Sequence, residues 1–168
     1  ESVTDYRPEP KDNLWVMIVA LSTGWDNYRH QADALAQYQM FKSRGISDDR
    51  IIMIGADDLA QNSLNPLPGV VRNEPGGVNV YSNVQYDYSI YDVTATDLLD
   101  ILSGRVEDDT PIVVDSTSTD NIYVFFVGHG GSTGLAVGAE TPEDATTGAA
   151  RFSVMRPSRF GRAIDKMY

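Results

Sequence analysis

The sequence contains no cysteine. Disulfide bonds, thiolate metal ligands and a cysteine nucleophile are therefore excluded from this chain. Histidine is scarce too, and His30 and His129 are the two imidazoles available for chemistry. No apolar run approaches the roughly 20 residues needed to span a bilayer, so we expect no transmembrane segment in the chain.

Positive charge is also in short supply. Thirteen Lys and Arg residues against 24 Asp and Glu residues leave a net charge of -11. Because nucleic-acid phosphates attract basic surfaces, this balance argues against a nucleic-acid partner. The hydrophobic content of 42% and the charged content of 22% are typical of a globular protein. A chain of 168 residues is long enough for one domain with its own core.

The first residues carry no hydrophobic targeting segment. Glu1 to Lys11 is polar, holds two prolines and has neither a start methionine nor the pattern of a signal peptide. We therefore expect residues 1–13 to be an N-terminal extension, and Glu1 to be the new end of a processed or truncated product.

Three short apolar runs predict the strands of a parallel sheet. Leu14–Leu21, Ile51–Ile54 and Asn121–Val127 are continuous runs, as expected of strands that are buried on both faces. A helical pattern from about Tyr28 to Arg44, ended by Gly45, joins the first two runs. This strand-helix-strand unit predicts a right-handed crossover.

The other elements are shorter. Asp57–Tyr91 is rich in Asn, Pro and Gly, and a long irregular excursion of this kind is usually functional. Thr94 is expected to cap a helix that ends at Gly104, and Ser158 to cap a last helix that runs to the final residue. A turn-rich loop is expected over Gly138–Ala150. The order of elements predicts an α/β sandwich.

Ligands of such sheets bind outside the carboxyl ends of the strands. Two polar loops are expected there, Ser22–His30 and Gly128–Ser132, and they contain both histidines. His129 is followed by Gly130, Gly131 and Gly134, and amides in a glycine-rich segment can approach and hold a developing oxyanion. The alternative is a turn histidine among flexible glycines.

The start of the first helix is the second candidate. A helix N-terminus favours anions, and Arg29 can grip a carboxylate or an amide in a forked geometry beside His30. The alternative is a solvated face, but two loops that meet at one sheet edge favour function. Asp57 and Asp58 could bind a metal or act as an acid/base pair, although turn-making and capping are favoured for them.

Several stretches resemble the legumain family of caspase-like cysteine peptidases, which includes asparaginyl endopeptidases and the catalytic subunit of GPI transamidase. The stretches are WVMIVALSTGWDNYRHQAD, GISDDRIIMIGADDLAQNSLNPLPGVV, NVYSNVQYDYSIYDVTATDLLDILSGR and YVFFVGHGGSTGL. They cover most of Leu14–Leu135 in the family's order. The resemblance implies a caspase-like α/β/α sandwich with a mostly parallel sheet, and residues 14–168 would be its N-terminal, incomplete part.

The resemblance also implies site residues. His129 matches the family's catalytic histidine, the amide of Gly130 matches part of the oxyanion hole, and Asn27 matches the asparagine that supports the histidine. Arg29 and His30 match residues of the primary specificity pocket, which accepts Asn and sometimes Asp. The implied chemistry is acyl transfer through a thioester, which water or an amine then releases.

Some positions depart from the family's pattern. Gly128 replaces the Asp that legumains have before the histidine, as in the transamidase subunit. Asp48 and Asp87 fall near the ligands of a calcium site proposed for that subunit, but Gln85 replaces an acid, so we assign no metal and no cofactor. In the family the nucleophile ends the strand after the histidine, which here would lie beyond Tyr168.

The expected partners are therefore a second polypeptide, or a missing C-terminal segment, that carries the cysteine, and a peptide or protein substrate. The expected location is secreted, periplasmic or lumenal. The alternatives are a non-catalytic binding or scaffold module with a degenerate peptidase fold, and a truncation with no biological meaning. The combination of Asn27, Arg29, His30 and His129 argues against a pure scaffold, which has no need for that set.

Overall fold

The computed structural model describes residues 13–105, 112–138 and 153–167. Most of the expected N-terminal extension, the acidic run 107–109, nearly all of the loop expected at Gly138–Ala150 and the last residue lie outside these ranges. Within them, no helix combines the length and the apolar character that crossing a bilayer requires.

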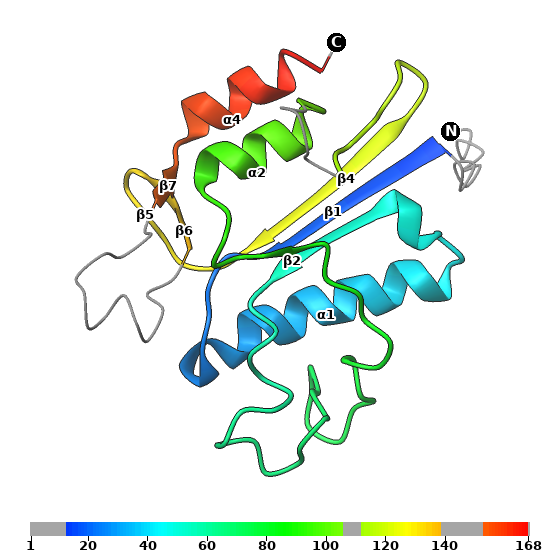
Figure 1. The fold of residues 1–168 in the computed structure, drawn as a ribbon, viewed down its shortest axis with the longest axis vertical. Coiled ribbons are helices and arrows are strands. Elements are labelled where there is room, and N and C mark those ends of the chain that lie inside the picture. Colours follow the sequence, from blue (N-terminus) through cyan, green and yellow to red (C-terminus); the bar gives the residue numbers. More distant parts are fainter. Residues whose placement is uncertain (1–12, 106–111, 139–152, 168) are drawn as a thin grey trace, which may run out of the picture.

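A parallel sheet forms the centre of the molecule (Figure 1). Its strand order is β3-β2-β1-β4, and each neighbouring pair is parallel. The bounds of its strands are β1 Leu14–Ala20, β2 Ile51–Gly55, β3 Tyr88–Ser89 and β4 Asn121–Val127. The three strands expected from apolar runs are confirmed, and the short β3 extends the sheet at one edge.

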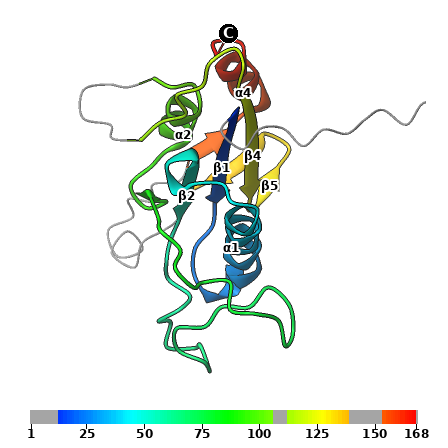
Figure 2. The same ribbon diagram turned by 90° about the vertical axis from the view of Figure 1, so that its right-hand side faces the viewer.

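Helices cover both faces of this sheet (Figure 2). Helix α1 (Tyr28–Ser43) packs on one face, whereas α2 (Ala95–Leu102) and α4 (Pro157–Ile164) pack on the other. The side chains of β1 alternate between the two cores, and both cores exclude solvent from them. This is the α/β/α arrangement that the sequence predicts, present here in part.

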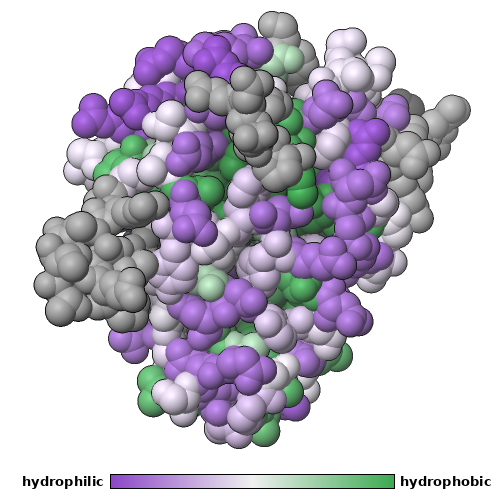
Figure 3. Space-filling model, viewed as in Figure 1, coloured by the Kyte–Doolittle hydropathy of each residue, from purple (hydrophilic) through white to green (hydrophobic). Residues whose placement is uncertain are grey.

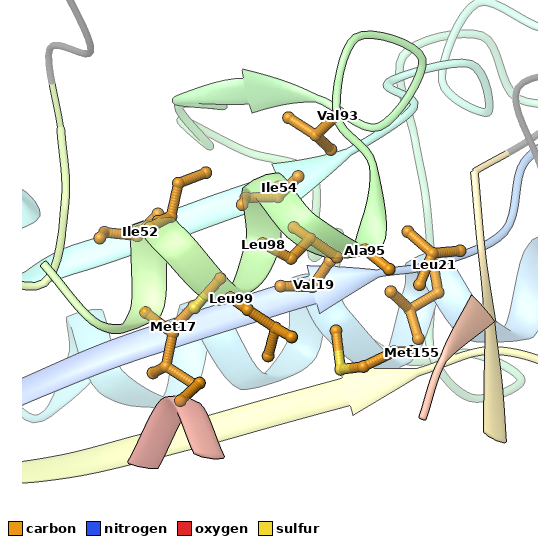
Figure 4. Close-up of a cluster of buried hydrophobic side chains, with 14 of the residues drawn as sticks. Met17, Val19, Leu21, Ile52, Ile54, Val93, Ala95, Leu98, Leu99 and Met155 are labelled. Carbon is orange, nitrogen blue, oxygen red and sulfur yellow. The ribbon is translucent and has the colours of Figure 1, made fainter. Parts of the chain in front are cut away.

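The core beneath α2 is drawn in Figure 4. Met17 and Val19 of β1 and Ile54 of β2 are fully buried there against Leu98 of α2. Burial of each such side chain contributes roughly 1.5–3 kcal/mol to folding. On the outside, polar residues cover most of the face seen in Figure 3, with apolar residues between them in small areas.

A second sheet was not expected from the sequence. It is antiparallel, in the order β5-β6-β7, and its strands are β5 Gly130–Gly131, β6 Gly134–Val137 and β7 Ser153–Met155. The segment Gly128–Ser132, expected to be a loop, therefore contains a short strand. Strands of two to four residues are too short to show a clear alternation of apolar and polar residues, and β5 and β6 also contain glycine.

The expected cap of the last helix is wrong. Arg156 is the N-cap of α4 and Pro157 is the first helical residue, so Ser158 lies inside the first turn. Proline favours this first position because its missing N–H would be unpaired there in any case and its φ is already helical.

The expected cap of α2 is confirmed. Thr94 and Asp97 form a capping box, in which the Thr94 amide donates to the Asp97 carboxylate at 2.7 Å. We predict that Thr94→Ala lowers the free energy of unfolding by about 1 kcal/mol, because an orphan amide of the first turn loses its acceptor. Urea unfolding would measure this. Thr96→Ala, the same change on the exposed face of α2, should have little effect; equal losses would contradict the role of the cap.

Candidate active site

The carboxyl ends of β1 and β4 lie side by side. Ala20 pairs with Val127, and the Leu21 amide continues the ladder by donating to the Val127 carbonyl at 2.8 Å. The two histidine-bearing loops therefore leave the sheet at one edge, where α1 begins and the β5-β6 hairpin lies (Figure 1). The convergence expected from the sequence is confirmed.

His129 makes a direct contact with Asn27 at this edge. Its Nε2 lies 2.7 Å from Asn27 Oδ1. The Asn27 side chain is itself oriented, because its Nδ2 donates to the Thr23 carbonyl at 2.8 Å. An amide oxygen accepts hydrogen bonds only, so the ring nitrogen that faces it carries the hydrogen. A neutral His129 then has its free lone pair on Nδ1, where it can take up a proton.

His30 lies directly against His129. The ring centroids are 4.9 Å apart with an interplanar angle of 83°. His30 is buried, and its Nδ1 shares a hydrogen bond of 2.6 Å with Ser22 Oγ. Burial, followed by the positive charges of Arg29 and His129, lowers the pKa of His30, against a smaller opposing effect of Asp33. A neutral His30 does not repel His129 when that ring gains a proton.

Arg29 and Gly130 lie on the outside of the same region. Arg29 is exposed, and its Nη1 donates to the Asp26 carbonyl at a long 3.4 Å. Gly130 is exposed in β5, opposite Leu135 of β6. The hairpin is tied back to the histidine, since the Ala136 amide donates to the His129 carbonyl at 2.9 Å.

Gly128 is required by the close approach of β1. A Cβ at this position would lie 2.7 Å from the Leu21 Cβ, which is inside any normal contact. The glycine found here in place of the Asp of legumains therefore fits the close packing against Leu21. With the present backbone, a side chain before His129 would require Leu21 or the strand end to shift.

Asp58 joins three segments around the site. Its Oδ2 accepts from the Gly24 amide at 2.7 Å and from the Tyr91 hydroxyl at 3.0 Å, and its Oδ1 accepts from Gln31 Nε2 at 2.6 Å. The expected turn role fits Asp57, whose φ is 51°. The carboxylate of Asp58 instead fixes the loop that carries Asn27, a role that the sequence did not predict because its partners lie 27 to 34 residues away.

The two acids near the possible calcium position have protein partners. Asp48 accepts from the Tyr38 hydroxyl at 2.6 Å and pairs with Lys42 at 2.8 Å, and Asp87 accepts from the Met53 amide at 2.8 Å. In the part of the chain that the structure describes, no three His, Asp or Glu side chains are grouped to hold a metal ion.

Comparison with known proteins gives a consistent relationship. The model of the Peptidase C13 family matches residues 14–155. The chain is 45% identical to legumain of Rattus norvegicus over 134 residues, which are 77% of this chain and 31% of that protein. It is 38% identical to legumain of Canavalia ensiformis over 138 residues, covering 78% and 29% of the two chains. It is 42% identical to the vacuolar-processing enzyme of Ricinus communis over 120 residues, covering 70% and 24%. The chain thus spans less than a third of the length of these relatives.

The Asp58 network gives a prediction for the loop that holds Asn27. Asp58→Asn removes the charge that three donors share, and hydrogen bonds to charged groups contribute roughly 1.5–3 kcal/mol each. We expect faster hydrogen exchange at the Gly24 amide and a change in the ¹⁵N shifts of the His129 ring. Asp57→Asn, the same change one residue earlier, is the control. Equal exchange at Gly24 in both variants would show that Asp58 does not hold the loop.

Proposed function

The chain belongs to the Peptidase C13 family, and we propose that it supplies the histidine half of a legumain-like cysteine endopeptidase or transpeptidase that cleaves after Asn or Asp. The observation that carries the proposal is the 2.7 Å contact between His129 and Asn27 where β1 and β4 end. It fixes the ring of an exposed histidine beside a glycine-rich hairpin. This arrangement supports the role of an oriented general base next to backbone donors.

The reaction follows from the roles of these groups. His129 takes the thiol proton on its free nitrogen, and the resulting thiolate attacks the main-chain carbonyl carbon of the Asn or Asp that precedes the cleaved bond. The Gly130 amide donates to the oxyanion that forms. The histidine then gives the proton to the leaving amine and a thioester remains. Water or a second amine attacks the thioester, which restores the thiol and completes hydrolysis or transpeptidation.

The cysteine has to come from outside this chain, which contains none. The exposed character of β4 supports a second polypeptide or a C-terminal segment as its source. In the described part of the chain β4 is an edge strand, and its residues are half-buried or exposed, unlike those of β1. A further strand parallel to β4 would pair its open backbone edge, and the end of that strand would lie next to His129.

The specificity pocket is proposed around Arg29 and His30. Arg29 offers several fixed donors and no acceptor, so it favours a carboxylate or the oxygen of an amide. Selection of Asn over Asp also needs an acceptor for the amide hydrogens, which we assign to the segment that supplies the cysteine. Buried His30 forms part of the floor, since its pKa is lowered and it adds no charge to the pocket.

We propose a secreted or lumenal location for the assembled peptidase. The name of the Ricinus communis relative, a vacuolar-processing enzyme, supports such a compartment.

The catalytic assignment predicts a loss of activity with an intact fold. In the peptidase assembled with its cysteine-bearing segment, His129→Ala should reduce turnover of an Asn-containing peptide by about 10² to 10⁴, because the general base is lost. Asn27→Ala should lower turnover by a smaller factor, because the ring loses its orientation. Asn73→Ala, at an exposed loop position, is the matched control. Circular dichroism would report the fold. His129→Ala activity within a few-fold of the unmodified protein would instead favour a non-catalytic scaffold.

The specificity assignment predicts the residue before the cleaved bond. On matched peptides with Asn, Asp, Arg, Lys or Leu at that position, cleavage should be confined to Asn and Asp, because a bound substrate that buries Arg29 without a matching acceptor leaves its donors unpaired at about 1–3 kcal/mol each. Arg29→Ala should weaken this preference, whereas Arg44→Ala, at the other end of α1, should not. Preference for Arg or Lys would overturn the assignment.

A further inference from the structure

A pocket lies between the start of α1 and the long excursion that follows β2. Its volume is about 280 Å³. Its walls are mainly aromatic and aliphatic, and they include Trp25, Tyr28, Pro66, Leu67, Val70 and Arg72. Ligand pockets for cofactors and drug-sized molecules run from about 300 to 1,000 Å³. The volume therefore suits one or two amino-acid side chains better than a cofactor.

Hydrogen bonds hold the walls of this pocket in place. The Tyr28 hydroxyl accepts from the Arg72 amide at 2.7 Å and donates to the Arg72 carbonyl at 3.0 Å, which ties the excursion to α1. The Nδ2 of buried Asn65 lies 3.1 to 3.2 Å from the carbonyl oxygens of Leu59, Ala60 and Val70, which share its two hydrogens, and its Oδ1 accepts from the Leu67 amide at 2.9 Å. The pocket is preformed, so a ligand need not order the loop.

The apolar groups of the rim remain partly in water. Leu67 is 48% exposed although its backbone is fixed through Asn65. A rigid loop that holds an apolar side chain at the mouth of an aromatic pocket marks a binding surface. Trp25 and Tyr28 add ring area, packed edge to face with centroids 5.1 Å apart. Arg72 brings a positive charge to the lining, which disfavours Lys and Arg as occupants.

One short helix carries residues of both the pocket and the candidate active site. The short helix Trp25–Asn27 carries both the pocket wall at Trp25 and the hydrogen bond of Asn27 to His129, and Tyr28 follows at once as the first residue of α1. The pocket wall at Trp25 is therefore two residues from the Asn27 side chain that contacts His129.

We propose that this pocket is a second specificity subsite, separate from the Arg29 pocket, which binds a bulky apolar side chain of the peptide substrate at a position other than the one before the cleaved bond. The inference rests on the proposed peptidase function and names part of its substrate class. Peptides with an aliphatic or aromatic residue near the Asn are the preferred substrates, and those with Gly or Lys at the same position are poor ones.

The test uses the peptidase assembled with its cysteine-bearing segment. Peptides with a single Asn carry Leu, Gly or Lys at each flanking position in turn. One position should give a lower KM for Leu than for Gly or Lys. Leu67→Ala should raise KM for that Leu peptide about three- to tenfold, as expected when apolar contacts with a side chain are lost. Leu64→Ala, the same change at a residue of the same loop that is 64% exposed, is the matched control.

A binding measurement separates the two proposals. Trp25 fluorescence, in a variant in which Trp15 is replaced by Phe, is titrated with the Leu and Gly peptides on the His129→Ala protein. Cleavage after Asn with no effect of flanking residues, and with equal KM values for Leu67→Ala and Leu64→Ala, would overturn the subsite and leave the peptidase function intact. If no peptide is cleaved, two results together support the pocket as a peptide site. The Leu peptide binds more tightly than the Gly peptide, and Leu67→Ala weakens the binding of the Leu peptide. Equal binding of both peptides overturns it.

Discussion

The parallel ladder between β1 and β4 runs from Leu14 opposite Asn121 to Ala20 opposite Val127. Backbone hydrogen bonds of this ladder fix the relative height of the two strands, and the Leu21 to Val127 bond extends it to the point where both loops begin. A shift of one residue along either strand would change which side chains face each core and would separate Asn27 from His129. The absence of a side chain at Gly128 is part of the same constraint, since a Cβ there would collide with Leu21.

Charge is distributed unevenly around this edge. The chain is strongly acidic, yet Arg29, His30 and His129 lie together where the strands end. Burial lowers the pKa of His30, so the fixed positive charge at this edge is that of Arg29. The Asp58 carboxylate lies behind the Asn27 loop and is occupied by three donors. An anion that enters the site therefore meets exposed donors from Arg29 and the hairpin first.

The main elements were predictable where a local pattern determines them. Continuous apolar runs identify β1, β2 and β4, because β1 and β2 are buried on both faces and the side chains of β4 pack, half-buried, against the same two cores. Thr94 with Asp97 is a cap that acts within one helical turn. The hairpin β5-β6 was missed because Gly130, Gly131 and Gly134 lack the side chains on which periodicity depends. The role of Asp58 and the hydrogen bonds of the Asn65 side chain were not predicted, for another reason. Both depend on which distant backbone groups the fold brings within reach, and no residue pattern encodes that.

The histidine half of the proposed site is preorganised by residues of this chain alone. Asn27 is oriented by Thr23, its loop is fixed by Asp58, and the His129 backbone is tied to β6 through Ala136. Preorganised donors and bases need no rearrangement when charge develops, which is the main source of catalytic stabilisation in such sites. A strand added along β4 then has to supply a thiol and a pocket acceptor, and its register on β4 determines whether the thiol reaches His129. Under the proposed function, the pairing that completes the sheet and the geometry that permits proton transfer are therefore the same backbone interaction.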